Sequence, residues 1–223
     1  DNIASGNKTL TPNEYRVVRK DGEILYVRTA GVIERKEGEA PRVFATVRDL
    51  SDLKRKEKAL VRRSEFERLI SEISSEFLGL PSEQIDSGIE RALADIASFS
   101  GADRAYVFLL QDDGVLVDNT HEWCAEGIEP QIKHLRKIPL DEKLPWFAKH
   151  FRKGKVLHVP DVAQLPTEAR LDRAHFQAQN ILSMVVVPML LKGRSIGFLG
   201  FDSVRKYRTW TEDDRACVWS ARS

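Results

Sequence analysis

The chain has 223 residues with a formal net charge of +1, and 42% of its residues are hydrophobic. This length suits one large or two small domains, and the balanced charge creates no overall field that would favour nucleic acid or an anionic membrane. No run approaches the ~20 apolar residues of a membrane span, and two cysteines are too few for a disulfide framework. With no basic-then-apolar leader at the first residues, the sequence predicts a cytoplasmic protein that is a piece of a longer one.

Three antiparallel strands are predicted in the first 48 residues. They are expected within 14–48, at about seven to ten residues each, because residues alternate as in half-buried strands around Tyr15 and Val17, around Ile24 and Tyr26, and from Val43 to Val47. Asp21-Gly22 predicts a type I′ hairpin turn, because that turn needs a positive φ at both positions. Residues 38–41 predict the second turn. A sheet of three such strands is marginal when it stands alone.

A long helix is predicted from Asp49 onward. Asp49-Leu50-Ser51-Asp52 offers helix-starting side chains, and neither Gly nor Pro follows until Gly79. Residues 54–63 are nearly all charged, which is typical of a connector or a short coiled coil and places the domain junction at about 49–63. The basic cluster Lys54-Arg55-Lys56 is interpreted as a solvated helix face and not as a nucleic-acid site.

A larger unit is predicted from about residue 64. Its expected helices are 64–78 and 82–99, its expected strands 104–111, 115–123, 155–159, 184–191 and 195–202, with two or three short helices within 126–180 and a last helix from Thr211. The nearly continuous apolar run at 184–191 predicts a central strand covered on both faces. Gly197 and Gly200 predict a close backbone approach or a bulge in the following strand.

The first part of the chain resembles the C-terminal half of PAS domains. The resemblance rests on Glu14 to Gly22, on Tyr26-Val27 and on the triplet Asp49-Leu50-Ser51. PAS domains commonly end with an Asp-Ile-Thr-like triplet that starts a signalling helix. The resemblance implies that Asp49 and Ser51 tie the last strand to the outgoing helix, and that this half-domain cannot enclose a cofactor.

Residues 65–223 resemble a GAF domain. The phrases that carry the resemblance are Thr120 to Cys124, Pro145-Trp146-Phe147, Val159 to Val162, Ser183 to Pro188, Gly197 to Asp202 and Arg208-Thr209-Trp210. The resemblance implies an α+β fold, with a six-stranded antiparallel sheet, helices on both faces and a pocket under the middle helices. The implied domains are a PAS remnant at 1–48, a linker helix at 49–63 and a GAF domain at 64–223. Such arrangements occur next to histidine kinase or diguanylate cyclase modules.

Five aromatic or imidazole side chains are the candidate ligand-binding residues. In the pocket that the GAF resemblance implies, Trp123 and Trp146 would form the lining, with His121, Phe147 and Phe198 nearby. Aromatic rings with a polar edge suit a small, flat or partly polar ligand. Ordinary core packing is the alternative for each residue. No catalytic residue and no metal ligand is assigned, and the cofactor stays unknown.

Other sites of this family were weighed against the sequence. None of the five histidines lies four residues from another His or Cys, so surface or core histidines are favoured over haem or metal ligands. Cys124 precedes Ala125, whereas the bilin-bearing cysteine of phytochrome-like GAF domains usually precedes a His. The signature of cyclic-nucleotide-binding GAF domains is matched only at Lys206 and Asp213-Asp214.

The leading functional hypothesis is a sensory relay to an output module beyond this sequence. A small ligand or a partner would alter the GAF fold, and the helix at 49–78 and the final helix would pair with their copies in a homodimer. One alternative is a ligand-free structural spacer. Another is a methionine sulfoxide reductase with the GAF fold, which would need several cysteines where this chain offers Cys124 and Cys217.

Overall fold

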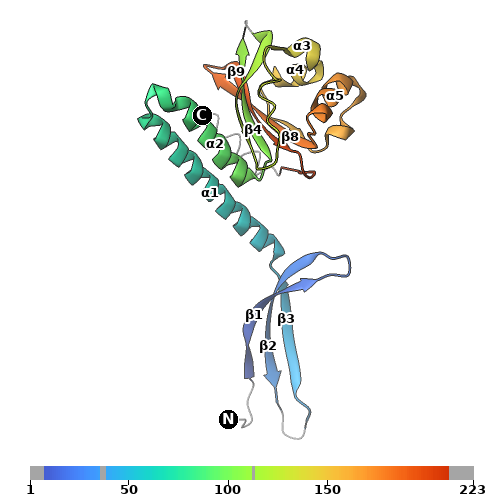
Figure 1. Ribbon diagram of the computed structural model, residues 1–223. Helices are drawn as coiled ribbons and strands as arrows, with labels where there is room; N and C mark the ends of the chain where they lie inside the picture. The colour runs from blue at the N-terminus through green and yellow to red at the C-terminus, as the bar shows by residue number, and fades with distance from the viewer. Residues whose placement is uncertain (1–7, 36–38, 112–113, 211–223) are drawn as a thin grey trace. The chain divides into compact units, whose positions relative to one another are not determined.

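A computed structural model describes residues 8–35, 39–111 and 114–210. Its contacts divide the chain into two units between residues 62 and 63, called here the first and the second unit (Figure 1). Within the described residues, no helix is both long enough and apolar enough to cross a membrane.

The first unit contains the three predicted strands. They are β1 (Lys8–Val18), β2 (Ile24–Glu34) and β3 (Arg42–Asp49), which pair antiparallel in the order β1-β2-β3. The type I′ prediction for the first turn is wrong, because Gly22 has a positive φ of 86° and Asp21 does not. Two backbone hydrogen bonds help explain the difference: the Gly22 N–H donates to the Arg19 carbonyl, and the Arg19 N–H donates to the Glu23 carbonyl. These bonds close a three-residue loop, which needs only one left-handed residue.

The triplet that ends β3 connects the sheet to α1 (Ser51–Gly79). The carboxylate of Asp49 accepts a hydrogen bond from the Ser51 N–H at 2.7 Å. The Ser51 hydroxyl in turn accepts one from the Tyr26 N–H on β2 at 2.9 Å. Side-chain contacts therefore tie the start of the helix to two strands, as the PAS resemblance implies.

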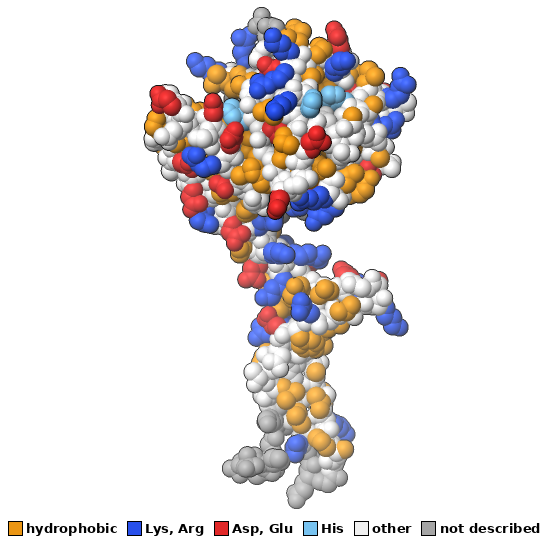
Figure 2. All heavy atoms as spheres, in the orientation of Figure 1, with side chains coloured by type: hydrophobic (Ala, Val, Ile, Leu, Met, Phe, Trp, Pro, Cys, Tyr) orange, Lys and Arg blue, Asp and Glu red, His pale blue; other side chains and the backbone are white. Residues whose placement is uncertain are grey.

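Apolar side chains of the first unit remain exposed. Tyr15, Val17, Val43 and Val47 are among the large hydrophobic residues that the structure leaves in solvent, and Figure 2 shows hydrophobic side chains over this part of the chain. The strand register places Tyr15 opposite Val27 and Val17 opposite Leu25, so these residues share one face of the sheet. On that face Tyr15 and Val17 of the edge strand β1 are exposed, whereas Val27 of the central strand β2 is buried, at 6% exposed.

The second unit contains the predicted six-stranded antiparallel sheet. Its order is β6-β5-β4-β9-β8-β7, with β4 (Arg104–Gln111), β5 (Leu116–Cys124), β6 (Ile138–Pro139), β7 (Leu157–Val159), β8 (Ser183–Leu191) and β9 (Arg194–Ser203). Strand β8 has Met184 and Val186 in one core and Val185 and Val187 in the other. This alternation explains its nearly continuous apolar sequence and confirms the prediction of a strand covered on both faces.

Two sets of helices cover the two faces of this sheet (Figure 1). α2 (Ile85–Ser100) packs on one face, in a core that also contains Phe66 of α1. The opposite core contains residues of the short helices α3 (Leu140–Lys143), α4 (Pro145–Phe151) and α5 (Arg170–Ala178). The predicted fold class is therefore confirmed. The short strand β6 was missed, and the helix predicted from Thr211 lies outside the described residues.

Candidate ligand-binding cavity

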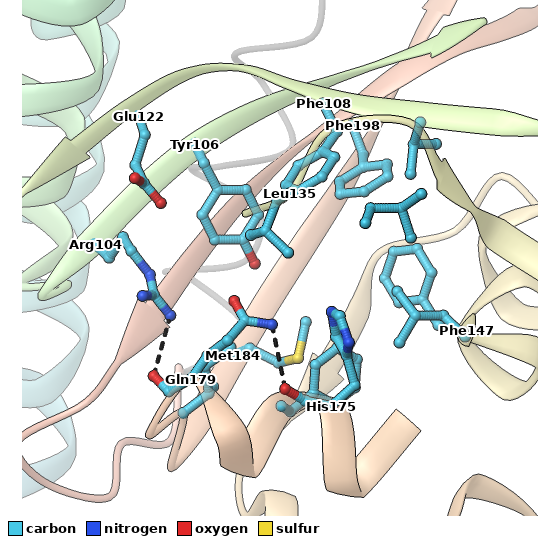
Figure 3. A pocket seen from close by; sticks show the side chains of 15 residues that line it. Arg104, Tyr106, Phe108, Glu122, Leu135, Phe147, His175, Gln179, Met184 and Phe198 are labelled. Atoms are coloured by element: carbon cyan, nitrogen blue, oxygen red, sulfur yellow. Dashed lines mark hydrogen bonds between the residues drawn. The ribbon is translucent and has the colours of Figure 1, made fainter. Parts of the chain in front are cut away.

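A cavity of about 40 Å³ lies between the sheet of the second unit and the α3–α5 layer (Figure 3). Its walls come from β4, β5, β8 and β9 on the sheet side and from α4 and α5 on the other side. The lining residues are Arg104, Tyr106, Phe108, Val117, Glu122, Leu135, Ile138, Leu144, Phe147, His175, Phe176, Gln179, Ile181, Met184 and Phe198.

Most of the cavity wall is aromatic or aliphatic. The rings of Phe108 and Phe198 are stacked with their centroids 4.8 Å apart, since β4 and β9 pair these two residues directly. The rings of Phe147 on α4 and Phe198 form an edge-to-face contact, with 5.1 Å between their centroids. Such ring pairs add to the burial energy of the side chains and hold the rings in fixed orientations. The apolar part of the cavity is thus preformed by the sheet and by α4.

One end of the cavity is polar and is built around a buried ion pair. Arg104 is 2% exposed and Asp202 is 0% exposed; Nη2 and Nε of Arg104 donate to one Asp202 oxygen at 2.9 and 3.2 Å. The Tyr106 hydroxyl donates to the other Asp202 oxygen at 2.9 Å. Burial raises the pKa of Asp202, while Arg104 and the two sets of hydrogen bonds oppose that rise. Burial also raises the pKa of Tyr106 well above its usual value, so its hydroxyl remains a donor.

Three further polar side chains reach this end. Glu122 of β5 accepts hydrogen bonds from the N–H groups of Gln131 and Ile132 at 2.7 and 2.8 Å, which fastens the loop after β5 to the sheet. Gln179, at the end of α5, donates its side-chain N–H to the backbone carbonyl of His175 at 3.2 Å. The backbone carbonyl of Gln179 accepts a hydrogen bond from Nη2 of Arg104 at 3.5 Å. Burial lowers the pKa of His175, which favours the neutral imidazole.

The α3–α5 layer is held together by a buried carboxylate. Asp172 of α5 is fully buried and accepts hydrogen bonds from the N–H groups of Trp146 and Phe147 at 3.2 and 2.8 Å. These N–H groups belong to the first turn of α4 and have no partner within their own helix. Asp172 therefore caps α4 from a neighbouring helix and couples the two helices that cover the cavity.

The structure brings only two of the five predicted site residues to the cavity. Phe147 and Phe198 line it, whereas His121, Trp123 and Trp146 do not. Trp123 packs in the opposite core, and the Nε2 atom of His121 lies 3.3 Å from Asp86 of α2. Trp146 stacks on His150, with 4.2 Å between the ring centroids, beside an open groove on the outside of α4.

A bulge in β5 explains the misplaced strand residues. Val117 faces the cavity, and strict alternation would put residues 119, 121 and 123 on the same face. The β4–β5 register shifts so that Val107 pairs with His121 and Phe108 with Asn119, which leaves Thr120 as an extra residue. Beyond Thr120 the faces are exchanged, and Glu122 points into the cavity.

The polar residues Arg104, Glu122, His175 and Gln179 were missed by the sequence analysis. The available signal was weak: Arg104 begins a mostly apolar strand, and Asp202 lies one residue before the end of the strand that pairs with it. Their bond joins positions that are 98 residues apart, so it can be inferred only when β4 is known to pair with β9.

Within the residues that the structure describes, no three His, Cys, Asp or Glu side chains come together as metal ligands would. Cys124 does not line the cavity, and burial raises the pKa of its thiol to about 11, which keeps it protonated near neutral pH. Cys217 lies outside the described residues.

Comparison with known proteins identifies relatives of this fold. The GAF domain model matches residues 85–218, more than half of the chain. The methanogenesis regulatory histidine kinase FilI of Methanothrix harundinacea is 29% identical to this chain over 185 residues. That match covers 79% of this chain and 20% of FilI, so the chain spans about a fifth of this relative's length.

Solved structures show the same arrangement. The phycocyanobilin-bound GAF domain of a cyanobacterial phytochrome superposes with a TM-score of 0.57 at 20% identity, covering 69% of this chain and 87% of that one. The GAF domain of a phosphoenolpyruvate-protein phosphotransferase from Coxiella burnetii gives 0.57 at 14% identity, covering 71% and 88%. At these identities the likeness is one of fold. With its six-stranded sheet covered on both faces and a family match across most of the second unit, the chain belongs to the GAF domain family.

Proposed function

We propose that this chain is the sensory part of a multidomain signalling protein and that its GAF domain binds a small molecule in the cavity under α3–α5. The observation that carries the proposal is the cavity itself: apolar walls, one polar end and a cover of short helices. The match to part of a regulatory histidine kinase supports an output module of that kind. A ligand that favours one arrangement of the covering helices would shift the population of that state.

The size of the cavity favours a second candidate, a ligand-free spacer. About 40 Å³ accommodates a few water molecules, whereas pockets for drug-sized ligands measure about 300–1,000 Å³. An organic ligand therefore requires the covering helices or their side chains to move outward. The spacer needs no such movement.

Filling the cavity tests whether there is open space between the sheet and the α3–α5 layer, which both candidates share. Val117→Ile adds one methylene group at the cavity wall and should leave the stability unchanged or raise it by about 0.5 kcal/mol. Val187→Ile adds the same group to the opposite, well-packed core and should cost about 1–3 kcal/mol. Urea unfolding measures both changes.

The same Val117→Ile variant tests ligand binding directly. Native mass spectrometry of freshly purified protein should detect a bound small molecule in the unmodified chain and none in the variant. An unmodified chain that carries no additional mass, together with unchanged signalling by Val117→Ile in the full-length protein, would favour the spacer.

We also propose that residues 1–48 are the C-terminal part of a PAS domain, that 49–63 form the linker and that the GAF domain begins at 64. The hydrogen bonds of Asp49 and Ser51 at the start of α1 support this, as does the exposed apolar face of the first unit. A larger PAS core would cover that face. The division of contacts between residues 62 and 63 supports the boundary.

A homodimer through α1 and the final helix is part of the same proposal. Leu53 and Leu60 lie one heptad apart on α1, and both are exposed, as is Val61. Replacing Leu53 and Leu60 by Lys should shift the sedimentation coefficient from that of a dimer to that of a monomer. If the unmodified chain sediments as a monomer at every concentration, the pairing of α1 is wrong.

A further inference from the structure

The polar end of the cavity contains more acidic than basic groups. Arg104 and Glu122 are the charged residues of the described chain that line it, and Asp202 lies directly behind Arg104. Arg104 is already paired with Asp202 through two donors and gives a third contact to the Gln179 carbonyl. One guanidinium thus faces two carboxylates. Near His175, Asp172 adds one negative charge and Lys143 adds one positive charge, so this pair leaves the excess of acidic over basic groups unchanged.

Several hydrogen-bond acceptors remain open to a ligand at this end, beside the Nη1 group of Arg104, for which the described residues provide no acceptor. Among the described residues, Oε1 of Gln179 and the unprotonated ring nitrogen of His175 accept no hydrogen bond, and Figure 3 shows both side chains reaching into the cavity. The other ring nitrogen of the neutral imidazole is an N–H donor. Glu122 adds its second carboxylate oxygen, Oε1, because the Gln131 and Ile132 N–H groups both donate to Oε2. A ligand that donates hydrogen bonds would satisfy these groups.

An anionic ligand would bring a negative charge that no group at this end of the cavity compensates, into a site with little water to solvate it. The positive charge of Arg104 is already balanced by the Asp202 carboxylate, which is 0% exposed, so an incoming anion would add a negative charge that has no counter-charge of its own. Repulsion from Glu122 adds to this cost, because charges interact more strongly in a protein interior than in water.

We propose that the cavity selects small, mostly apolar molecules that are uncharged or cationic and carry a hydrogen-bond donor, and that it rejects organic anions. This inference rests on the proposed function of the cavity as a ligand site. It gives Glu122 the role of a specificity determinant, while the Phe147 and Phe198 rings supply the apolar contact.

Three one-ring probes of equal size test the proposal: benzamide, benzylamine and benzoate. The chain contains only two methionines, Met184 in the cavity wall and Met189 outside it on the same strand. In protein labelled at the methionine methyl groups, NMR titration should shift the Met184 signal and leave that of Met189 in place. We expect benzamide and benzylamine to bind at least about tenfold more tightly than benzoate.

Two variants then separate local from overall charge. Glu122→Gln keeps an acceptor for the Gln131 and Ile132 N–H groups but removes the charge, and it should reduce the preference for benzamide over benzoate to about twofold or less. Glu129→Gln removes the same charge at an exposed site and should leave the preference unchanged.

The possible failures have different meanings. If benzoate shifts Met184 as readily as benzamide does, the charge selectivity is wrong while the ligand site stands. If Glu129→Gln changes the preference as much as Glu122→Gln does, overall charge and not Glu122 is responsible, and the inference is overturned. If none of the probes shifts Met184, both the ligand site and its selectivity are contradicted.

Discussion

Replacing Arg104 by Met should lower the free energy of unfolding by about 3–5 kcal/mol at neutral pH. The substitution leaves the Asp202 carboxylate at 0% exposure with the Tyr106 hydroxyl as its remaining side-chain partner. A buried charge without a counter-charge loses its hydration and receives no compensating attraction. Urea unfolding measures the loss, and tryptophan fluorescence reports it because Trp123, Trp146 and Trp210 all lie in the second unit.

The loss in Arg104→Met should depend on pH in a defined direction. Burial already raises the pKa of Asp202, and removal of Arg104 takes away the group that opposes that rise. In the folded variant the pKa of Asp202 therefore lies further above its value in the unfolded chain. Folding then takes up a proton, so stability falls as the pH rises from the unfolded pKa to the folded one. The variant should lose less stability in mildly acidic solution than at neutral pH.

Two controls identify the buried charge as the cause. Arg104→Met combined with Asp202→Leu removes both charges and should recover most of the stability, since apolar replacements of buried pairs are often neutral. Arg152→Met breaks an exposed pair in which two nitrogens contact Asp141 at 2.5 and 2.6 Å, and it should cost no more than about 1 kcal/mol. Equal losses from the two arginine variants, or no recovery in the double variant, would contradict the explanation.

The order of elements in the second unit could be predicted because its signals are local. The apolar run at 184–191, the turn at Lys192-Gly193 and the break at Gly101 each depend on neighbouring residues. Gly101 has a φ of 65°, which allows it to end α2 in the left-handed conformation. Phe147 and Phe198 line the cavity where the GAF resemblance implied a pocket, whereas Trp123 and Trp146, assigned on the same ground, do not.

The rest of the cavity depends on register and on distant pairing. The extra residue Thr120 in β5 exchanges the two faces of the strand, so Glu122 lies in the cavity and Trp123 in the opposite core. No local pattern of hydrophobic and polar residues predicts such a bulge. The pairing of Arg104 with Asp202 likewise follows from the alignment of β4 with β9, and a lone arginine in a strand is normally expected at the surface.

Gly197→Ala should be the most damaging small substitution in the sheet, with a loss of about 3 kcal/mol. A Cβ atom at Gly197 would overlap with the carbonyl oxygen of Phe108 and lie 3.1 Å from the Cα atom of Leu109. Both atoms belong to the backbone of β4, which cannot rotate away as a flexible side chain can. The strands would have to separate where Phe108 and Phe198 form the cavity wall.

Gly79→Ala is the matched control, because a Cβ atom there meets no heavy atom within 4 Å at the end of α1. It should change the free energy of unfolding by no more than about 0.5 kcal/mol, or raise it slightly by restricting the unfolded chain. Urea unfolding of the two variants compares the same added methyl group in open space and between two strands. Because the added group is identical, a difference between them measures the close approach of β9 to β4. Equal stabilities would mean that these strands are further apart at Gly197 than the structure places them, and the wall formed by Phe108 and Phe198 would then be looser than a preformed site requires.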